Sequence, residues 1–159
     1  MLEQPLLATL TENGQSSVEE GITCISQLLY NQDQISMRMW NFYLIIVDLI
    51  VNNKGILDEF IHAASVPLIN FVSKNPEQFR TATFEGHGPC MDMMFTLIGR
   101  IFEVARVKED EIEAMCGVTL LITLLENVSG IESSLHSILE FLIKELGSAK
   151  TPEYKCMLS

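Results

Sequence analysis

The residues best suited to chemistry stand in a short glycine-rich stretch, FEGHGPC, at residues 84–90. His87 precedes Cys90 by three positions, and Glu85 stands close by. Imidazole, thiolate and carboxylate groups bind zinc, but a zinc site needs about four ligands and usually takes them as two closely spaced pairs. The sequence offers no second pair. We therefore prefer to interpret this stretch as a solvated loop.

A nucleophilic cysteine is the other chemistry that such residues could perform. It needs a base within hydrogen-bond reach of the thiol, which spacing along the chain does not reveal. Cys24 and Cys116 fall in apolar helical patterns, where cysteine is usually a small core residue, and His62 and His136 fall on polar helix faces. The motifs of serine hydrolases, phosphate-binding loops and zinc proteases do not occur. We expect no enzyme, and hence no catalytic residue, metal or cofactor.

The composition limits the class of protein that positions these residues. The chain has 159 residues, 48% of them hydrophobic, which suits one folded domain with a sizeable core. Its 21 acidic residues outnumber the 10 basic ones and give a net charge of −11. This charge repels nucleic acid and anionic lipid and favours basic protein partners. Four widely spaced cysteines show no disulfide framework and indicate reduced thiols inside a cell.

The most apolar stretch, MWNFYLIIVDLIVNN at residues 39–53, indicates the fold class. It is too short for a membrane span, which takes about 20 apolar residues, so we expect no membrane insertion. Its period favours a helix, although a buried strand stays possible for residues 42–47. On a helical wheel its polar side is a stripe about 80° wide, which predicts a helix packed on three sides. The stripe contains Arg38, Asn41, Asp48 and Asn52.

The rest of the chain also follows a helical period. Pro67 is expected to bend or split one of the helices, residues 75–90 are expected to form a loop, and no strand or hairpin is indicated. The segment 131–147 is amphipathic, with Ile131, Leu135, Ile138, Leu139, Leu142 and Leu146 expected to face the core. The predicted helical segments are 18–31, 56–74, 91–107, 108–130 and 131–147.

Residues 48–60 and residues 123–135 share a sequence pattern and form an internal repeat at an offset of 75. In each copy a mostly buried helix leads through a glycine-ended turn into a more amphipathic helix. That is the unit of an α-solenoid of the HEAT or armadillo kind, with a period of about 40 residues. We therefore predict an all-α fold in which antiparallel helix pairs stack over residues 1–159 as a single segment.

The last residues indicate a helix start. Thr151 suits the N-cap, Pro152 the first helical position and Glu153 the first turn. Because the chain stops so soon afterwards, we expect it to be a fragment of a longer superhelical protein. The final CMLS also fits a prenylation signal at Cys156. We prefer the alternative, in which these residues belong to a helix that continues.

Residues 31–72 resemble a known family, the importin-β superfamily of nuclear transport receptors, and most closely its importin-7 and importin-8 type. The residues that carry the resemblance are Ile35-Ser36, Met39-Trp40, Gly55, Phe60 and Pro67-Leu68. Met37 stands where these relatives often have proline. The resemblance continues more loosely through the later helices, and in all it covers about residues 17 to 158.

The resemblance implies a piece from the C-terminal half of a receptor that shuttles between cytoplasm and nucleus. Such receptors bind protein cargo, which is often basic, and phenylalanine-glycine nucleoporins. They bind Ran-GTP chiefly through an N-terminal part, which this piece would lack. No binding motif of the family carries over to single residues of this chain. Our own candidates for contact with basic cargo are the acidic residues Glu109, Asp110, Glu111 and Glu113. The alternative is a HEAT-repeat scaffold or adaptor unrelated to nuclear transport.

Overall fold

The computed structural model describes residues 4–5, 8, 10, 17–32, 34–52 and 59–159, which are mostly helical. The predicted all-α class is therefore confirmed. A 3-10 turn, η2, spans Glu132–Ser134, and two short strands, β1 (Thr83–Phe84) and β2 (Gly88–Pro89), form an antiparallel ladder. The helices are α2 (Val18–Tyr30), α3 (Met37–Val51), α4 (Ile61–Lys74), α5 (Pro76–Thr81), α6 (Cys90–Lys108), α7 (Glu111–Asn127), α8 (Leu135–Ser148) and α9 (Pro152–Leu158).

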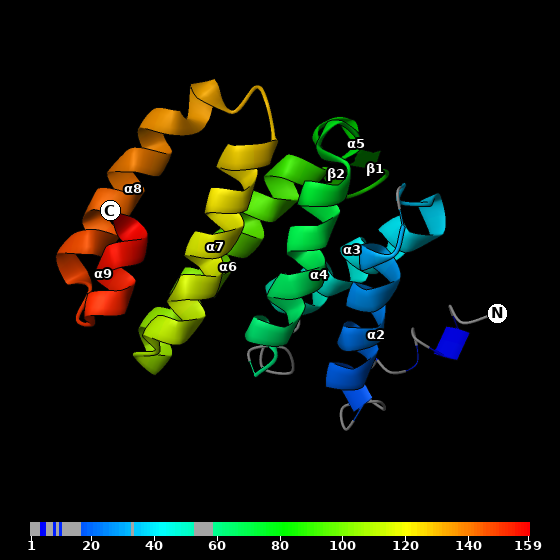
Figure 1. Cartoon of the computed structure of the whole chain (residues 1–159), viewed down its shortest axis with the longest axis horizontal. Helices are drawn as coiled ribbons and strands as arrows, with labels where there is room; N and C mark the ends of the chain where they lie inside the picture. The colour runs from blue at the N-terminus through cyan, green and yellow to red at the C-terminus, as the bar shows by residue number, and fades with distance from the viewer. Residues whose placement is uncertain (1–3, 6–7, 9, 11–16, 33, 53–58) are drawn as a thin grey trace.

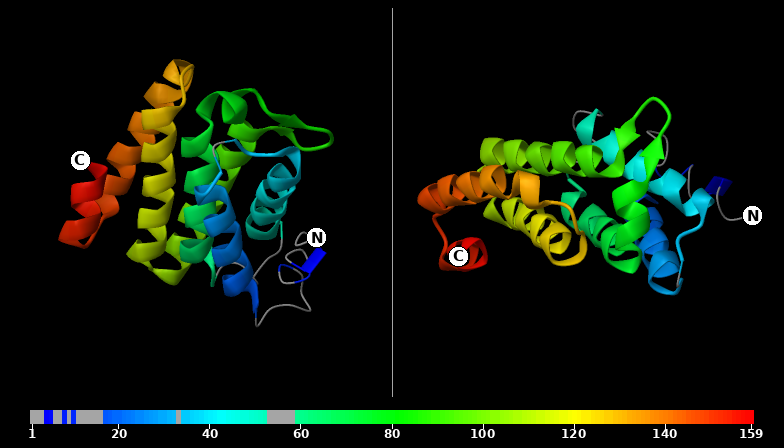
Figure 2. Two further views of the ribbon diagram at one scale, coloured as in Figure 1. Left: turned by 45° about the vertical axis from the view of Figure 1, so that its right-hand side comes forward. Right: turned by 90° about the horizontal axis from the view of Figure 1, so that it is seen from above.

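The long helices lie in two layers, as Figures 1 and 2 show. In one layer α2, α4, α7 and α9 follow one another, and each contacts the next. In the other layer α3 lies beside α6. The α8 helix adjoins α6 through Phe141 and Phe102, whose ring centroids are 4.7 Å apart. The two layers are joined most extensively where α6 packs on α7, because only Glu109 and Asp110 separate these helices.

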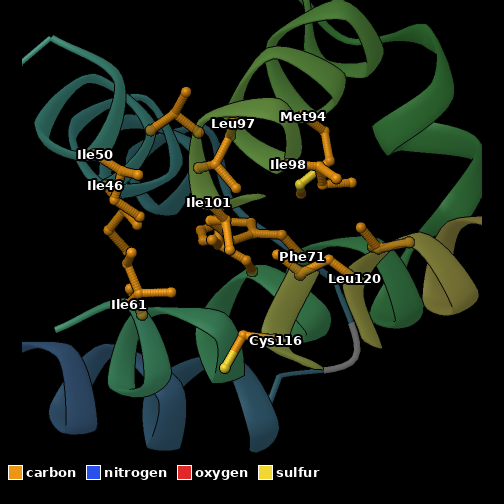
Figure 3. Packing of buried hydrophobic residues seen from close by; sticks show 14 of the residues in the cluster. Ile46, Ile50, Ile61, Phe71, Met94, Leu97, Ile98, Ile101, Cys116 and Leu120 are labelled. Carbon is orange, nitrogen blue, oxygen red and sulfur yellow. The ribbon is translucent and has the colours of Figure 1, made fainter. Parts of the chain in front are cut away.

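The core lies between the layers and is built from apolar side chains of successive helices (Figure 3). Trp40 and Tyr43 project from α3 onto Phe71 of α4, with ring centroids 5.2 and 5.4 Å from that ring. The Tyr43 hydroxyl donates a hydrogen bond of 2.9 Å to the carbonyl of Cys90, so it ties α3 to the start of α6. Other interior residues in Figure 3 include Ile46, Ile50, Ile61, Leu97, Ile101 and Leu120.

The α3 helix confirms the interpretation of the most apolar stretch. Ser36 caps it by accepting a hydrogen bond from the backbone N–H of Met39. The predicted polar stripe is exposed at Arg38, Asn41 and Asp48, and the remaining sides are buried or half-buried. A helix covered on three sides requires neighbours in both layers, and α4 and α6 are those neighbours.

Residues 75–90 were wrongly predicted to be a simple loop. They contain α5, which Asn75 caps by accepting a hydrogen bond from the N–H of Gln78, and then the β1–β2 hairpin. Strands of two residues are too short to show a period-two pattern, so the sequence carries no signal for them. Gly86 and Gly88 have φ of 79° and 87°, which lets the backbone turn between the strands.

Of the two alternatives for Pro67, the split is excluded, because α4 runs unbroken from Ile61 to Lys74. The bend stays a prediction. The internal repeat at an offset of 75 predicts that α3 and α7 take equivalent positions. In the structure α3 lies beside α6 in one layer, whereas α7 lies beside α4 in the other. The two copies therefore occupy different places in the fold. The turn of the first copy falls partly on residues 53–58, which lie outside the described residues.

The orientation of α8 also differs from the prediction. Ile131 and Ile138 are buried as expected, but Leu135, Leu139 and Leu146 are 39%, 56% and 37% exposed. The acidic side chain of Glu145 is buried instead. Phe141 packs α8 against α6, and in this orientation the most regular apolar stripe of α8 faces solvent. A wheel locates such a stripe but does not reveal which side of the helix the neighbours cover.

Candidate functional site

The structure separates His87 from Cys90, the two residues considered above as metal ligands. His87 is exposed in the hairpin turn, whereas Cys90 begins α6 with no solvent exposure. Burial raises the pKa of the Cys90 thiol to about 12, so this cysteine stays protonated. Nowhere in the described ranges do three or more His, Cys, Asp or Glu side chains group in a way that could hold a metal ion.

A cysteine and a histidine do meet elsewhere. Sγ of Cys116 on α7 lies 3.5 Å from Nδ1 of His62 on α4, a contact that sequence reasoning missed because 54 residues separate the two. Burial raises the pKa of the Cys116 thiol, a hydrogen bond with Ser65 opposes that effect, and the carboxylate of Glu113 adds to it. A buried thiol that stays protonated is a poor nucleophile. The pair therefore fits a packing contact between α4 and α7.

Three of the four acidic residues chosen as a cargo site have partners around the α6–α7 turn. Asp110 caps α7 by accepting hydrogen bonds from the N–H groups of Ile112 and Glu113, at 2.9 and 3.3 Å. Glu113 pairs with Lys108 at 2.8 Å. Glu109, whose φ of 53° is left-handed, ends α6 and pairs with Lys150 at 3.2 Å. These carboxylates stabilise the turn, and their contact with a basic partner stays a prediction.

Glu111, the fourth, holds the approach to α9. Its carboxylate accepts hydrogen bonds from the backbone N–H groups of Lys150 and Thr151. Thr151 in turn caps α9 by accepting a hydrogen bond from the N–H of Tyr154. The structure thus brings the acidic cluster together with the predicted helix start, and it uses the cluster to attach α9.

A polar cleft of about 280 Å³ lies beside this attachment, between the ends of α6, α8 and α9. Within it a guanidinium nitrogen of Arg106 lies 3.2 Å from one carboxylate oxygen of Glu145. The hydroxyl of Tyr154 donates to the other oxygen at 3.4 Å. Burial, and then the charge of Glu145, raise the pKa of Tyr154. The charges in the cleft are therefore largely paired with one another, which makes it a joint between helices.

An apolar groove of about 370 Å³ opens between α6, α7 and α8, and it is the strongest candidate for a binding site. Phe102 and Phe141 pack edge to face in its wall. At Gly99 an added Cβ would meet nothing within 4 Å, so the groove is open above this residue. Sequence reasoning missed the groove because its lining comes from three helices. The lining residues are Phe95, Ile98, Gly99, Phe102, Leu121, Ser133, Ser134, Ser137, Ile138 and Phe141.

Comparisons of the chain with known protein families, with curated proteins and with solved structures find no match. The helices of the described part are all too short or too polar to span a membrane.

Proposed function

We propose that this chain is a segment of an α-solenoid of the HEAT kind, built from the pairs α3–α4, α6–α7 and α8–α9. Two observations support this architecture. In each pair the first helix lies in the layer of α3, α6 and α8, and the second lies in the layer of α4, α7 and α9. Each pair also packs mainly on the next one, which is how solenoid repeats bury their apolar faces.

We further propose that the segment belongs to a nuclear transport receptor and that its groove binds phenylalanine-glycine nucleoporins. The observation that carries this proposal is the groove between α6 and α8. Its apolar walls suit an aromatic side chain, because rings gain from edge-to-face contact with Phe102 and Phe141. The resemblance of residues 31–72 to the importin-β superfamily agrees with this assignment.

The chemistry of the groove fits a short phenylalanine-glycine motif in two ways. Three serine hydroxyls, Ser133, Ser134 and Ser137, line it together with the rings and can hydrogen-bond to a peptide backbone. A glycine beside the phenylalanine lets that backbone approach closely. One small groove binds a single motif weakly, so useful affinity requires many motifs on one nucleoporin chain. Weak individual contacts in turn allow a receptor to pass through a pore.

In this proposal the binding of cargo and of Ran-GTP belongs to the whole receptor. A net charge of −11 favours basic protein cargo at long range, and Ran-GTP binds through a part of the receptor that precedes this chain. The four acidic residues around the α6–α7 turn stay the candidates for contact with basic cargo, and they also hold that turn and the approach to α9.

A peptide titration tests the proposal. A synthetic peptide with several Phe-Gly motifs is added to the ¹⁵N-labelled chain, with a Ser-Gly peptide as control. We expect shifts confined to amides around Gly99, Phe102 and Ser137, and none with the control peptide. The Gly99→Leu substitution fills the groove and should weaken binding at least about tenfold, the effect of losing a buried aromatic contact. Thr96→Leu, one turn away on α6 and outside the groove lining, should bind normally.

The same titration shows when the proposal is wrong. If the Phe-Gly peptide shifts no groove amide, or if Gly99→Leu binds as well as the unaltered chain, the groove is not a nucleoporin site. The solenoid would then fit a scaffold or adaptor protein better than a transport receptor.

A further inference from the structure

The apolar groove has three serines in its lining whose hydroxyls have no partner. Ser133, Ser134 and Ser137 line it from η2 and α8, and within the described ranges their hydroxyls make no hydrogen bond to another protein group. Other helical serines bond to their own backbone. The hydroxyls of Ser73 and Ser148 donate to the carbonyls four residues earlier, at 2.8 and 3.1 Å. The groove serines are therefore free to react.

Ser137 joins this free hydroxyl to an exposed position in the groove. It lies one turn before Phe141 on α8, so the two side chains line the same side of the groove. Glu140 follows it by three positions. A carboxylate so close suits a kinase with a basic substrate site, because clusters of basic side chains bind acidic segments.

We propose that Ser137 is a phosphorylation site, and that a phosphate there closes the groove to apolar ligands. This inference rests on the proposed function, since it concerns when the groove accepts its ligand. In the reaction, Oγ of Ser137 attacks the γ-phosphorus of ATP held by the kinase. The new O–P bond forms as the bond to the bridging oxygen of ADP breaks, and the hydroxyl proton passes to the base of the kinase.

The start of α8 is loosely held, which gives a kinase access to Ser137. A kinase binds its substrate segment in an extended form, so the first turn of the helix has to open. Neither η2 nor α8 has a side-chain hydrogen bond that caps its N-terminal end. Uncapped helix ends leave backbone N–H groups to water and open at little cost in free energy.

The phosphate would act on the groove while α8 stays folded. Ser137 is the third residue of α8, and the dipole of a helix favours an anion in its first turn. A groove of about 370 Å³ has room for a phosphoryl group. The neighbouring carboxylate of Glu140, which pairs with His136 at 3.2 Å, repels the phosphate and does not neutralise it.

A charge at this place opposes the binding of an aromatic side chain. Phosphoserine carries about −1.5 to −2 charges at neutral pH and holds water around them. An aromatic ring that entered the groove would have to remove part of this water, and burying a charge without a partner costs free energy. The affinity of the groove for a phenylalanine side chain should therefore fall at least about tenfold.

Ser129 offers a matched control on the same segment. It is also exposed and is also followed by a glutamate, Glu132, at the third position. However, it lies outside the groove lining, and its hydroxyl donates to a carboxylate oxygen of Glu77 at 3.4 Å. A phosphate on Ser129 should leave binding in the groove unchanged.

Phosphorylation of the purified chain tests the inference. The chain is treated with ATP and casein kinase II, an acid-directed serine kinase, and mass spectrometry locates the phosphate. We expect it on Ser137. Binding is followed at the Gly99 amide with the Phe-Gly peptide and with indole, a neutral aromatic probe. Treatment should weaken both at least about tenfold in the unaltered chain and in Ser129→Ala, and it should change neither affinity in Ser137→Ala.

Two further variants give a reading that does not depend on the kinase. Ser137→Glu places a charge in the groove and should weaken indole binding relative to Ser129→Glu, which places the same charge outside it. A chain that is not phosphorylated at Ser137, or that binds indole equally well with the phosphate in place, would overturn the inference. Equal indole binding by the two glutamate variants would do the same.

The two probes separate this inference from the proposed function. If the unmodified chain binds indole but not the Phe-Gly peptide, the nucleoporin assignment is wrong, and the indole series still decides whether a phosphate closes the groove. If the unmodified chain binds neither probe, the groove accepts no aromatic group and both proposals are wrong.

Discussion

The carboxylate of Glu111 accepts a hydrogen bond from the backbone N–H of Thr151 at 2.9 Å. It also accepts one from the N–H of Lys150 at 2.5 Å. A single side chain in the first turn of α7 therefore satisfies backbone donors that precede α9. Hydrogen bonding to Thr151, and then to Lys150, lowers the pKa of Glu111, so the ionised form is the one that holds α9.

Removing this carboxylate should loosen α9. In Glu111→Ala we expect the amides of α9 to exchange with solvent about two- to tenfold faster relative to α7, the usual effect of losing such hydrogen bonds. Hydrogen exchange followed by mass spectrometry measures this ratio. Glu126→Gln alters an exposed carboxylate elsewhere on α7 and serves as the control. Equal protection of α9 in Glu111→Ala would show that these bonds do not hold the helix.

The attachment of α9 should also depend on pH. Because the folded pKa of Glu111 is lowered, its contribution is complete above the unfolded value of about 4.3 and is lost as pH falls through the folded pKa. The NMR signals of Tyr154 and Leu158 should therefore change in the acid range. In Glu111→Gln, which has no charge to lose, this acid transition should be much smaller. An unchanged transition would assign it to another carboxylate.

Gly117 marks the closest approach between α7 and α6. An added Cβ would lie 2.9 Å from Cε2 of Phe102, whose ring is buried and packed on Phe141. Gly117→Ala should therefore lower the free energy of unfolding by about 1–3 kcal/mol, as overpacking usually does. Gly99→Ala adds the same methyl group where nothing lies within 4 Å and should raise stability by about 0.5–1 kcal/mol. Urea unfolding compares both, and equal changes in the two variants would contradict the close approach.

Alkaline pH should destabilise the protein, because it favours ionisation of the buried Cys90 thiol. The folded pKa of Cys90 is about 12, well above the unfolded value of about 8.5, so its contribution is complete below pH 8.5 and falls as pH rises toward 12. The free energy of unfolding should decrease by up to about 1.4 kcal/mol per pH unit. Cys90→Ala should flatten this slope, whereas Cys156→Ala, which alters an exposed thiol, should leave it unchanged. Identical slopes in all three proteins would refute the assignment.

The thiols should also differ in reactivity. Cys156 is exposed and should be alkylated first by iodoacetamide, whereas Cys116 is buried with a raised pKa and should react more than about tenfold more slowly. If the contact with His62 is only packing, His62→Ala will not slow the alkylation of Cys116. Mass spectrometry of the peptides follows both rates. A fast reaction at Cys116 that His62→Ala abolishes would instead reveal an activated cysteine.

Most of the helices and several of their ends follow from local sequence patterns. The polar stripe of α3, the acidic first turn of α7 and the start of α9 at Thr151 all follow from neighbours within one or two turns. Such patterns are local, because the helical period and capping depend on residues three to four positions apart. The hairpin between α5 and α6 left no such pattern and could not be predicted.

What each helix face touches depends on how the helices pack together. This packing turned the leucines of α8 outward and buried Glu145, it used the acidic cluster to attach α9, and it brought His62 to Cys116 across 54 residues. The groove likewise combines Phe95 with Phe141 from helices that are separate in the sequence. A wheel fixes the angle between residues on one helix, whereas the packing of neighbouring helices sets which angle faces the core.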